Sequence, residues 1–149
     1  MINQSQSITK LCAAFVKAQS EMGAAITDSL NPHFKSKYAD LTSVLDAVTP
    51  ALHNNGLAIM QFPGEAEGMI TLTTRIIHES GEYMDAEAVM APDKRGAHAV
   101  GSCLTYLRRY SAAAICGLTQ ADDDGNAGTG KAPIDTSGAE SQLKNAAKE

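Results

Sequence analysis

Cysteine and histidine are few in this 149-residue sequence, and their spacing matches neither a metal site nor a disulfide framework. The three cysteines, Cys12, Cys103 and Cys116, are an odd number without a C-x-x-C pair, which argues against zinc and disulfide roles. All three fall in helical patterns, so we expect reduced thiols that pack as small apolar side chains. The four histidines also lack ligand spacing. We therefore expect no metal and no cofactor.

Long apolar runs are missing too. No segment approaches the ~20 apolar residues of a membrane-spanning helix. The first residues, MINQSQSITK, lack the cationic-then-apolar order of a signal peptide. We expect a cytoplasmic protein without a membrane contact. Its length suits one domain that buries roughly two thirds of its unfolded surface.

An excess of basic residues is the third absence. Lys and Arg number 12 against 17 Asp and Glu, which gives a net charge of −5 and lowers the expectation of nucleic-acid binding. The imbalance is uneven, however. Residues 1–119 contain 9 basic and 11 acidic residues, whereas residues 120–149 contain 3 and 6. The body is therefore nearly neutral, and its basic residues cluster at 35–37, 94–95 and 108–109.

Catalytic and nucleotide-binding motifs are matched only in part. The segment 125–132, GNAGTGKA, resembles a phosphate-binding P-loop, but Ala132 replaces the hydroxyl that would hold magnesium and no strand precedes it. A calcium-loop frame would put Gln120 first and Lys131 last, where carboxylates are needed. No activated serine or cysteine is recognisable. We expect that the protein is not an enzyme.

Three adjacent carboxylates, Asp122, Asp123 and Asp124, allow three hypotheses. They could join a two-metal nuclease site that activates water. Such sites usually draw carboxylates from separated strands, so a solvated acidic helix terminus is the favoured interpretation. A contact with a basic patch on a neighbouring subunit is the third.

The longest helical pattern runs from Gly96 to Gly117. Residues at three- and four-residue steps predict its buried face: Val100, Cys103, Leu104, Leu107, Ser111, Ala114, Ile115 and Leu118. The opposite side is small, polar and basic: His98, Ser102, Thr105, Arg109 and Ala113, with Tyr106 and Tyr110 on one flank and Arg108 on the other. Guanidinium groups offer forked donors suited to phosphate, so a partner is expected there. Arg108, nearer the buried face, is expected to serve core or subunit contacts more than Arg109.

Two earlier helices are predicted. An amphipathic pattern over 8–22 gives the first, with Ser5 or Ser7 as its cap. Asp40 caps the second, and Pro50 inside its pattern predicts a kink or a new short helix.

Strand-like runs follow at 57–62, 69–78 and 82–90, joined by short turns that favour an antiparallel meander. In the middle run, apolar residues alternate with polar ones, which predicts one buried face and one face that carries Arg75. The predicted fold is α+β, a three-stranded antiparallel β-meander backed by helices on one face.

The segment between the first two helices, 26–40, has two interpretations. A solvated loop with Phe34 anchored in the core is the simpler one. If the segment is extended, Lys35 and Lys37 point the same way, opposite Tyr38, and form a basic strip interleaved with an aromatic side chain.

Two separated motifs carry a family resemblance. The first is NPHFKSKYADL at 31–41, followed by NGLA at 55–58; the second is GSCLTYLRRY at 101–110, which runs on to DDDGN at 122–126. Over roughly residues 8 to 126, the chain resembles the ERF (essential recombination function) family of phage and prophage single-strand annealing proteins. The resemblance implies an ATP-independent protein that coats single-stranded DNA, assembles into rings or filaments and pairs complementary strands. It also implies a fold similar to ring-forming annealing proteins.

The resemblance assigns roles to the matching positions. The expected DNA-binding residues at motif positions are Lys35, Lys37, Tyr38, Tyr106, Arg108 and Arg109. A tyrosine stacked on a base would contribute ~1–3 kcal/mol. Arg75, Lys94 and Arg95 are weaker candidates, since charge alone supports them. The cluster at 122–124 matches a family feature whose role stays open.

The implied organisation is an annealing core at 1–126 and a flexible tail at 127–149. The implied partners are single-stranded DNA, further copies of the chain, and a host single-strand-binding protein or a phage exonuclease in the bacterial cytoplasm. Two alternatives stay open: a metal-dependent nuclease that uses Asp122–Asp124, and an assembly module that binds no nucleic acid.

Overall fold

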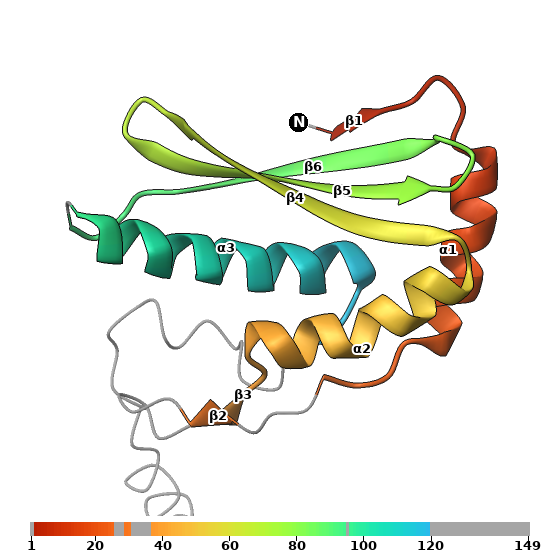
Figure 1. Cartoon of the computed structure of the whole chain (residues 1–149), viewed down its shortest axis with the longest axis horizontal. Coiled ribbons are helices and arrows are strands. Elements are labelled where there is room, and N and C mark those ends of the chain that lie inside the picture. The colour runs from red at the N-terminus through yellow and green to blue at the C-terminus, as the bar shows by residue number, and fades with distance from the viewer. Residues whose placement is uncertain (1, 26–28, 31–36, 95, 120–149) are drawn as a thin grey trace, which may run out of the picture.

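The computed structural model describes residues 2–25, 29–30, 37–94 and 96–119, which form two layers (Figure 1). One layer is an antiparallel β-sheet. The other is helical: α2 (Leu41–Asn54) and α3 (Ala97–Cys116) lie along one face of the sheet, and α1 (Thr9–Glu21) packs at one end. The predicted α+β class is thus confirmed. In the part of the chain that the structure describes, no helix is both long and apolar enough to span a bilayer.

The main sheet has four strands where three were predicted. Its order is β1-β6-β5-β4, with β1 at Ile2–Gln4, β4 at Leu57–Ala66, β5 at Met69–His78 and β6 at Tyr83–Met90. The added strand, β1, pairs antiparallel with β6. It has only three residues, all exposed, so it shows no alternation by which it could have been predicted.

Strand β4 continues beyond its predicted end at Phe62, through Pro63 and Gly64. Because β4 is an edge strand, the missing N–H of a proline is tolerated there. The chain then reverses through Glu67 and Gly68, which both have positive φ angles, 54° and 79°. Two such residues between paired strands are typical of a type I′ hairpin, and the predicted six-residue turn is therefore a two-residue one.

The predicted Asp40 cap of α2 is confirmed, since its carboxylate accepts a hydrogen bond from the Ser43 amide at 2.8 Å. Pro50, predicted to kink or restart the helix, lies inside one continuous α2. Just before α2, two short strands, β2 (Ser29–Leu30) and β3 (Lys37–Tyr38), form a separate antiparallel ladder.

The start of α1 is held by a residue far away in the sequence. Neither Ser5 nor Ser7 caps the helix as predicted, and its N-cap Ile8 makes no side-chain cap bond. Instead, the Glu82 carboxylate, just before β6, accepts hydrogen bonds from the Leu11 amide at 2.8 Å and the Ser7 hydroxyl at 2.9 Å. A carboxylate at a helix N-terminus also interacts favourably with the helix dipole, so α1 is fastened to the sheet.

These bonds make the stability of the fold depend on pH. The Leu11 amide bond, followed by the Ser7 bond, holds the pKa of Glu82 below its ordinary value of 4.5. A lowered folded-state pKa stabilises the fold above the unfolded-state pKa, and this stabilisation is lost as pH falls through the folded value. Glu82→Gln is therefore expected to flatten the decline of stability below about pH 4.5, with up to about one proton fewer taken up on unfolding. Urea titrations between pH 7 and pH 2.5 measure this, and an unchanged acid slope would contradict it.

The core lies between the layers. A first cluster joins all three helices to the sheet, with buried members Leu11, Ala18, Val48, Leu52, Leu57, Ile76 and Cys116. A second unites the beginning of α2 with α3 through Ala39, Val44, Ala112 and Ala113. A third lies under the other end of the sheet, with Ile70, Leu72, Cys103 and Leu107. Burial raises the pKa of the Cys116 thiol to about 11, so it stays protonated and packs as predicted. Cys12, in contrast, is exposed.

The buried face of α3 differs from the predicted one near its C-terminus. Cys103 and Leu107 are buried as expected, but Ala113 is buried and Ala114 is exposed. The physical reason is that α3 has two neighbours. Its first half packs on the sheet, whereas its second half also meets Ala39 and α2, which cover the side that was expected to face solvent.

Candidate nucleic-acid interface

The outer side of α3 carries a close, tilted pair of tyrosines with an arginine beside both rings. Tyr106 and Tyr110 are four residues apart, so they are neighbours on the helix surface, and their ring centroids are 4.2 Å apart with 34° between planes. The Arg109 guanidinium lies 4.6 Å from the Tyr110 centroid and 5.5 Å from that of Tyr106. Tyr106 is 43% exposed. The site therefore presents an aromatic surface beside a cation, an arrangement on which bases stack in single-strand binding proteins.

Arg109 also connects the two sequence motifs. Its Nη1 donates a hydrogen bond of 3.1 Å to the carbonyl oxygen of Ala39, which is fully buried against Ala112 and Ala113. Ala39 directly follows β3, whose residues are Lys37 and Tyr38. The backbone of the first motif therefore lies against the arginine of the second, although 70 residues separate Ala39 from Arg109.

Arg108 is held differently, by the edge strand of the sheet. Its Nε donates to Oε1 of Gln61 at 3.2 Å, while Nε2 of Gln61 donates to the Arg108 carbonyl oxygen at 3.0 Å and to the Thr74 hydroxyl at 3.3 Å. The side chain stays exposed. The bond uses Nε, so it fixes the arginine while leaving the outer end of the guanidinium for a phosphate.

The burial of the two arginines is the reverse of the prediction. Arg108 was expected nearer the core, yet it is exposed, and Arg109 is half-buried. Arg109 is covered because Ala39 packs against this part of α3. Gln61 was not predicted as a site residue. The sequence signal that could have identified it is a polar side chain at a position of β4 that faces the helices.

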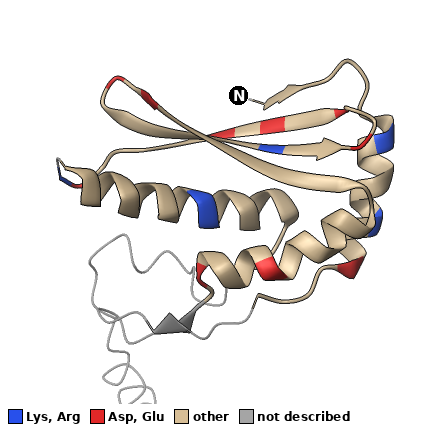
Figure 2. Ribbon diagram, in the orientation of Figure 1, with Lys and Arg blue, Asp and Glu red and all other residues tan. Residues whose placement is uncertain are grey.

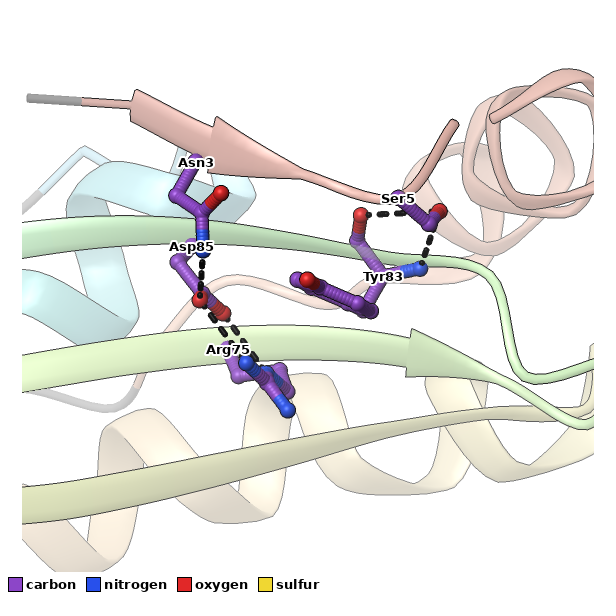
Figure 3. Close-up of polar contacts among 5 residues, drawn as sticks. All are labelled: Asn3, Ser5, Arg75, Tyr83 and Asp85. Carbon is purple, nitrogen blue, oxygen red and sulfur yellow. Dashed lines mark hydrogen bonds and ion pairs between the residues drawn. The ribbon is translucent and has the colours of Figure 1, made fainter. Parts of the chain in front are cut away.

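Arg75 lies elsewhere, on the sheet face that points away from the helices. Its guanidinium forms a bidentate pair with Asp85, at 2.7 Å and 2.9 Å, and Asn3 donates to the same carboxylate at 3.3 Å (Figure 3). The Arg75 bonds are the main reason that the pKa of Asp85 is lowered. The Tyr83 ring lies 4.0 Å from the guanidinium carbon. Arg75 is thus engaged in the sheet and is not brought together with Arg108 and Arg109.

The remaining candidates are only partly described. Lys94 is exposed in the loop before α3. For Lys37 and Tyr38 the structure gives the backbone of β3 alone. Lys35, Arg95 and the acidic cluster Asp122–Asp124 lie outside the described residues, so the structure does not test their roles. Within the described ranges, no three His, Cys, Asp or Glu side chains are placed to hold a metal ion.

Comparison with protein-family models gives a match over most of the chain. The family model described as the ERF superfamily matches residues 11–149. Searches of curated proteins and of solved structures found no match to this chain. The matched region includes both motifs that Arg109 and Ala39 connect, and it extends past the predicted core boundary at 126. Because the match covers nearly the whole chain, the protein belongs to the ERF superfamily.

Proposed function

We propose that the protein binds single-stranded DNA and anneals complementary strands without ATP, in phage homologous recombination. The observation that carries the proposal is the contact between Arg109 and Ala39, since it unites both family motifs beside a tyrosine pair of which Tyr106 is exposed. Arg108 supplies a phosphate contact, Tyr106 a stacking surface, and the Lys37–Tyr38 strand a second edge of the binding surface.

A nearly neutral body suits this task. Annealing requires that each strand stay free enough to search for its complement, so few phosphate contacts per protomer are an advantage. When several linked protomers each bind one DNA strand weakly, the first contact raises the effective concentration of the strand for the others. The overall affinity is then much higher than that of one protomer. We therefore propose that the protein acts as an assembly of several copies.

Arg108→Ala is expected to slow annealing of two complementary fluorescent oligonucleotides by about tenfold, because one phosphate contact per protomer is lost. It is also expected to make the slope of log K against log salt shallower by about 0.7 on single strands. Both are measured without ATP, by fluorescence transfer and by anisotropy at several salt concentrations.

Arg108→Lys is the matched control, since it keeps the charge and should keep the salt slope. Circular dichroism checks that each variant is folded. If folded Arg108→Ala anneals as the parent protein does, Arg108 does not contact DNA. If end-labelled strands become shorter in magnesium, a nuclease replaces the annealing proposal.

A further inference from the structure

The sheet face that points away from the helices carries an apolar patch. In β5, Thr71 and Thr73 lie on this face and alternate with the buried Ile70 and Leu72. The residues of β4 and β6 that pair with the β5 residues of this face lie on the same side. These neighbours include three strongly exposed apolar side chains: Met60 at 42%, Phe62 at 44% and Val89 at 51%. In Figure 1 no described helix covers this face. Apolar side chains that gather on one face are typical of an interaction surface.

The charges around the patch disfavour nucleic acid as its occupant. Residues 57–90 contain six acidic residues and one basic residue, a net charge of −5 (1 − 6). Glu82 is bonded to the start of α1, and Asp85 pairs with the one cation. The single cation, Arg75, is already paired with Asp85 (Figure 3). Glu87 is exposed opposite Thr73 on the same face, and Glu65 and Glu67 lie at the hairpin end. The surface therefore suits a partner that is apolar at its centre and basic at its margin.

The outer surface of α1 has those properties. Val16 is 70% exposed, and the small exposed residues Ala13 and Ser20 lie along the same line of the helix. Lys10 and Lys17 flank this line on one side, where they line a shallow hollow beside His78. Figure 2 shows basic positions on α1, and acidic positions along β6 and at the strand turns.

We infer that the open sheet face of one protomer binds α1 of a second copy. Pairing of two open faces with each other would bring two acidic surfaces together, each with an exposed Glu87, and like charges repel. Pairing with α1 brings Lys10 and Lys17 to those carboxylates and buries Val16 against Phe62 and Met60. The two surfaces are different and lie on different parts of the chain. The contact is therefore head-to-tail and repeats into a ring or a filament.

The contact would line up the DNA-binding surfaces of successive copies, and its effect on annealing rests on the proposed function. The contact itself follows from the exposure and the charge of the sheet and of α1.

The test uses one variant for each surface, Phe62→Asp for the sheet and Val16→Asp for α1. Mass photometry and sedimentation without DNA measure the assembly of the full chain. Each variant alone is expected to have an association at least about tenfold weaker, since a carboxylate would replace an apolar side chain at the centre of the contact and lose water on burial. Mixed in equal amounts, they should form a 1:1 dimer of twice the 15.6 kDa chain mass and nothing larger, because each still has one intact surface.

Ala97→Asp, an exposed apolar-to-acidic change at the start of α3, is the control and should assemble like the parent protein. Should either aspartate variant be misfolded by circular dichroism, a charge reversal replaces it. Glu87→Lys and Lys17→Glu should each weaken assembly, and their combination in one chain should restore it.

Several outcomes would overturn the inference: a parent protein that stays monomeric at all concentrations, aspartate variants that assemble normally, or a mixture that stays monomeric. If Phe62→Asp assembles normally but no longer binds DNA, the open sheet face binds DNA and not a second copy. Failure of the proposed function is separate, since it would leave assembly intact and abolish annealing by the assembled parent protein.

Discussion

Replacing Leu52 by alanine is expected to lower the free energy of unfolding by about 2–5 kcal/mol. Leu52 is fully buried in α2, in the cluster that contains Leu11 of α1, Leu57 of β4 and Cys116 of α3. The loss combines the transfer free energy of the deleted carbons with the cavity left among elements that cannot all close in on it. A typical domain has only about 5–15 kcal/mol of stability, so this single change removes a large fraction.

Urea unfolding followed by circular dichroism measures the effect, at one fixed protein concentration because assembly also stabilises the folded chain. Ile2→Ala is the control, since Ile2 is 69% exposed and its loss should change stability by less than about 0.5 kcal/mol. If Leu52→Ala and Ile2→Ala unfold at the same urea concentration, the cluster that joins the three helices is not the centre of the core.

The elements of this fold could be predicted where local sequence decides them. The 3.6-residue period of α1 and α3, the alternation in β5 and the Asp40 cap all depend on neighbouring residues, and the structure has each. Features that depend on distant partners were missed. Glu82 replaces the predicted cap of α1 from 71 residues away, and β1 exists as a strand only because β6 offers an edge.

The same division applies to the candidate interface. Family motifs and charge selected Tyr106, Arg108 and Arg109 from the sequence, and the structure places them together on α3. Which arginine is exposed could not be predicted from helical periodicity, because Ala39 packs on α3 and covers the Arg109 side. Arg75 was predicted as a DNA-binding residue from its charge alone. In the structure that charge pairs with Asp85, which lies directly opposite Arg75 in the register of β5 and β6.

Tyr106→Ala is expected to weaken single-stranded DNA binding by roughly 5- to 150-fold, which corresponds to ~1–3 kcal/mol for one stacked base. One ring face of Tyr106 is supported by Tyr110 at 4.2 Å, and the ring as a whole is 43% exposed. The ring is thus held in place before a base arrives, so little conformational entropy is lost on stacking. Fluorescence anisotropy with a labelled oligonucleotide measures the affinity.

Tyr106→Phe separates stacking from hydrogen bonding, because it keeps the ring and removes only the hydroxyl. It should bind within about twofold of the parent protein if the ring face provides the contact. The salt dependence distinguishes Tyr106 from Arg108. Loss of a stacked base leaves the number of neutralised phosphates unchanged, so Tyr106→Ala should keep the parent salt slope while Arg108→Ala makes it shallower. Equal affinities of Tyr106→Ala and Tyr106→Phe would mean that the ring of Tyr106 does not stack on a base.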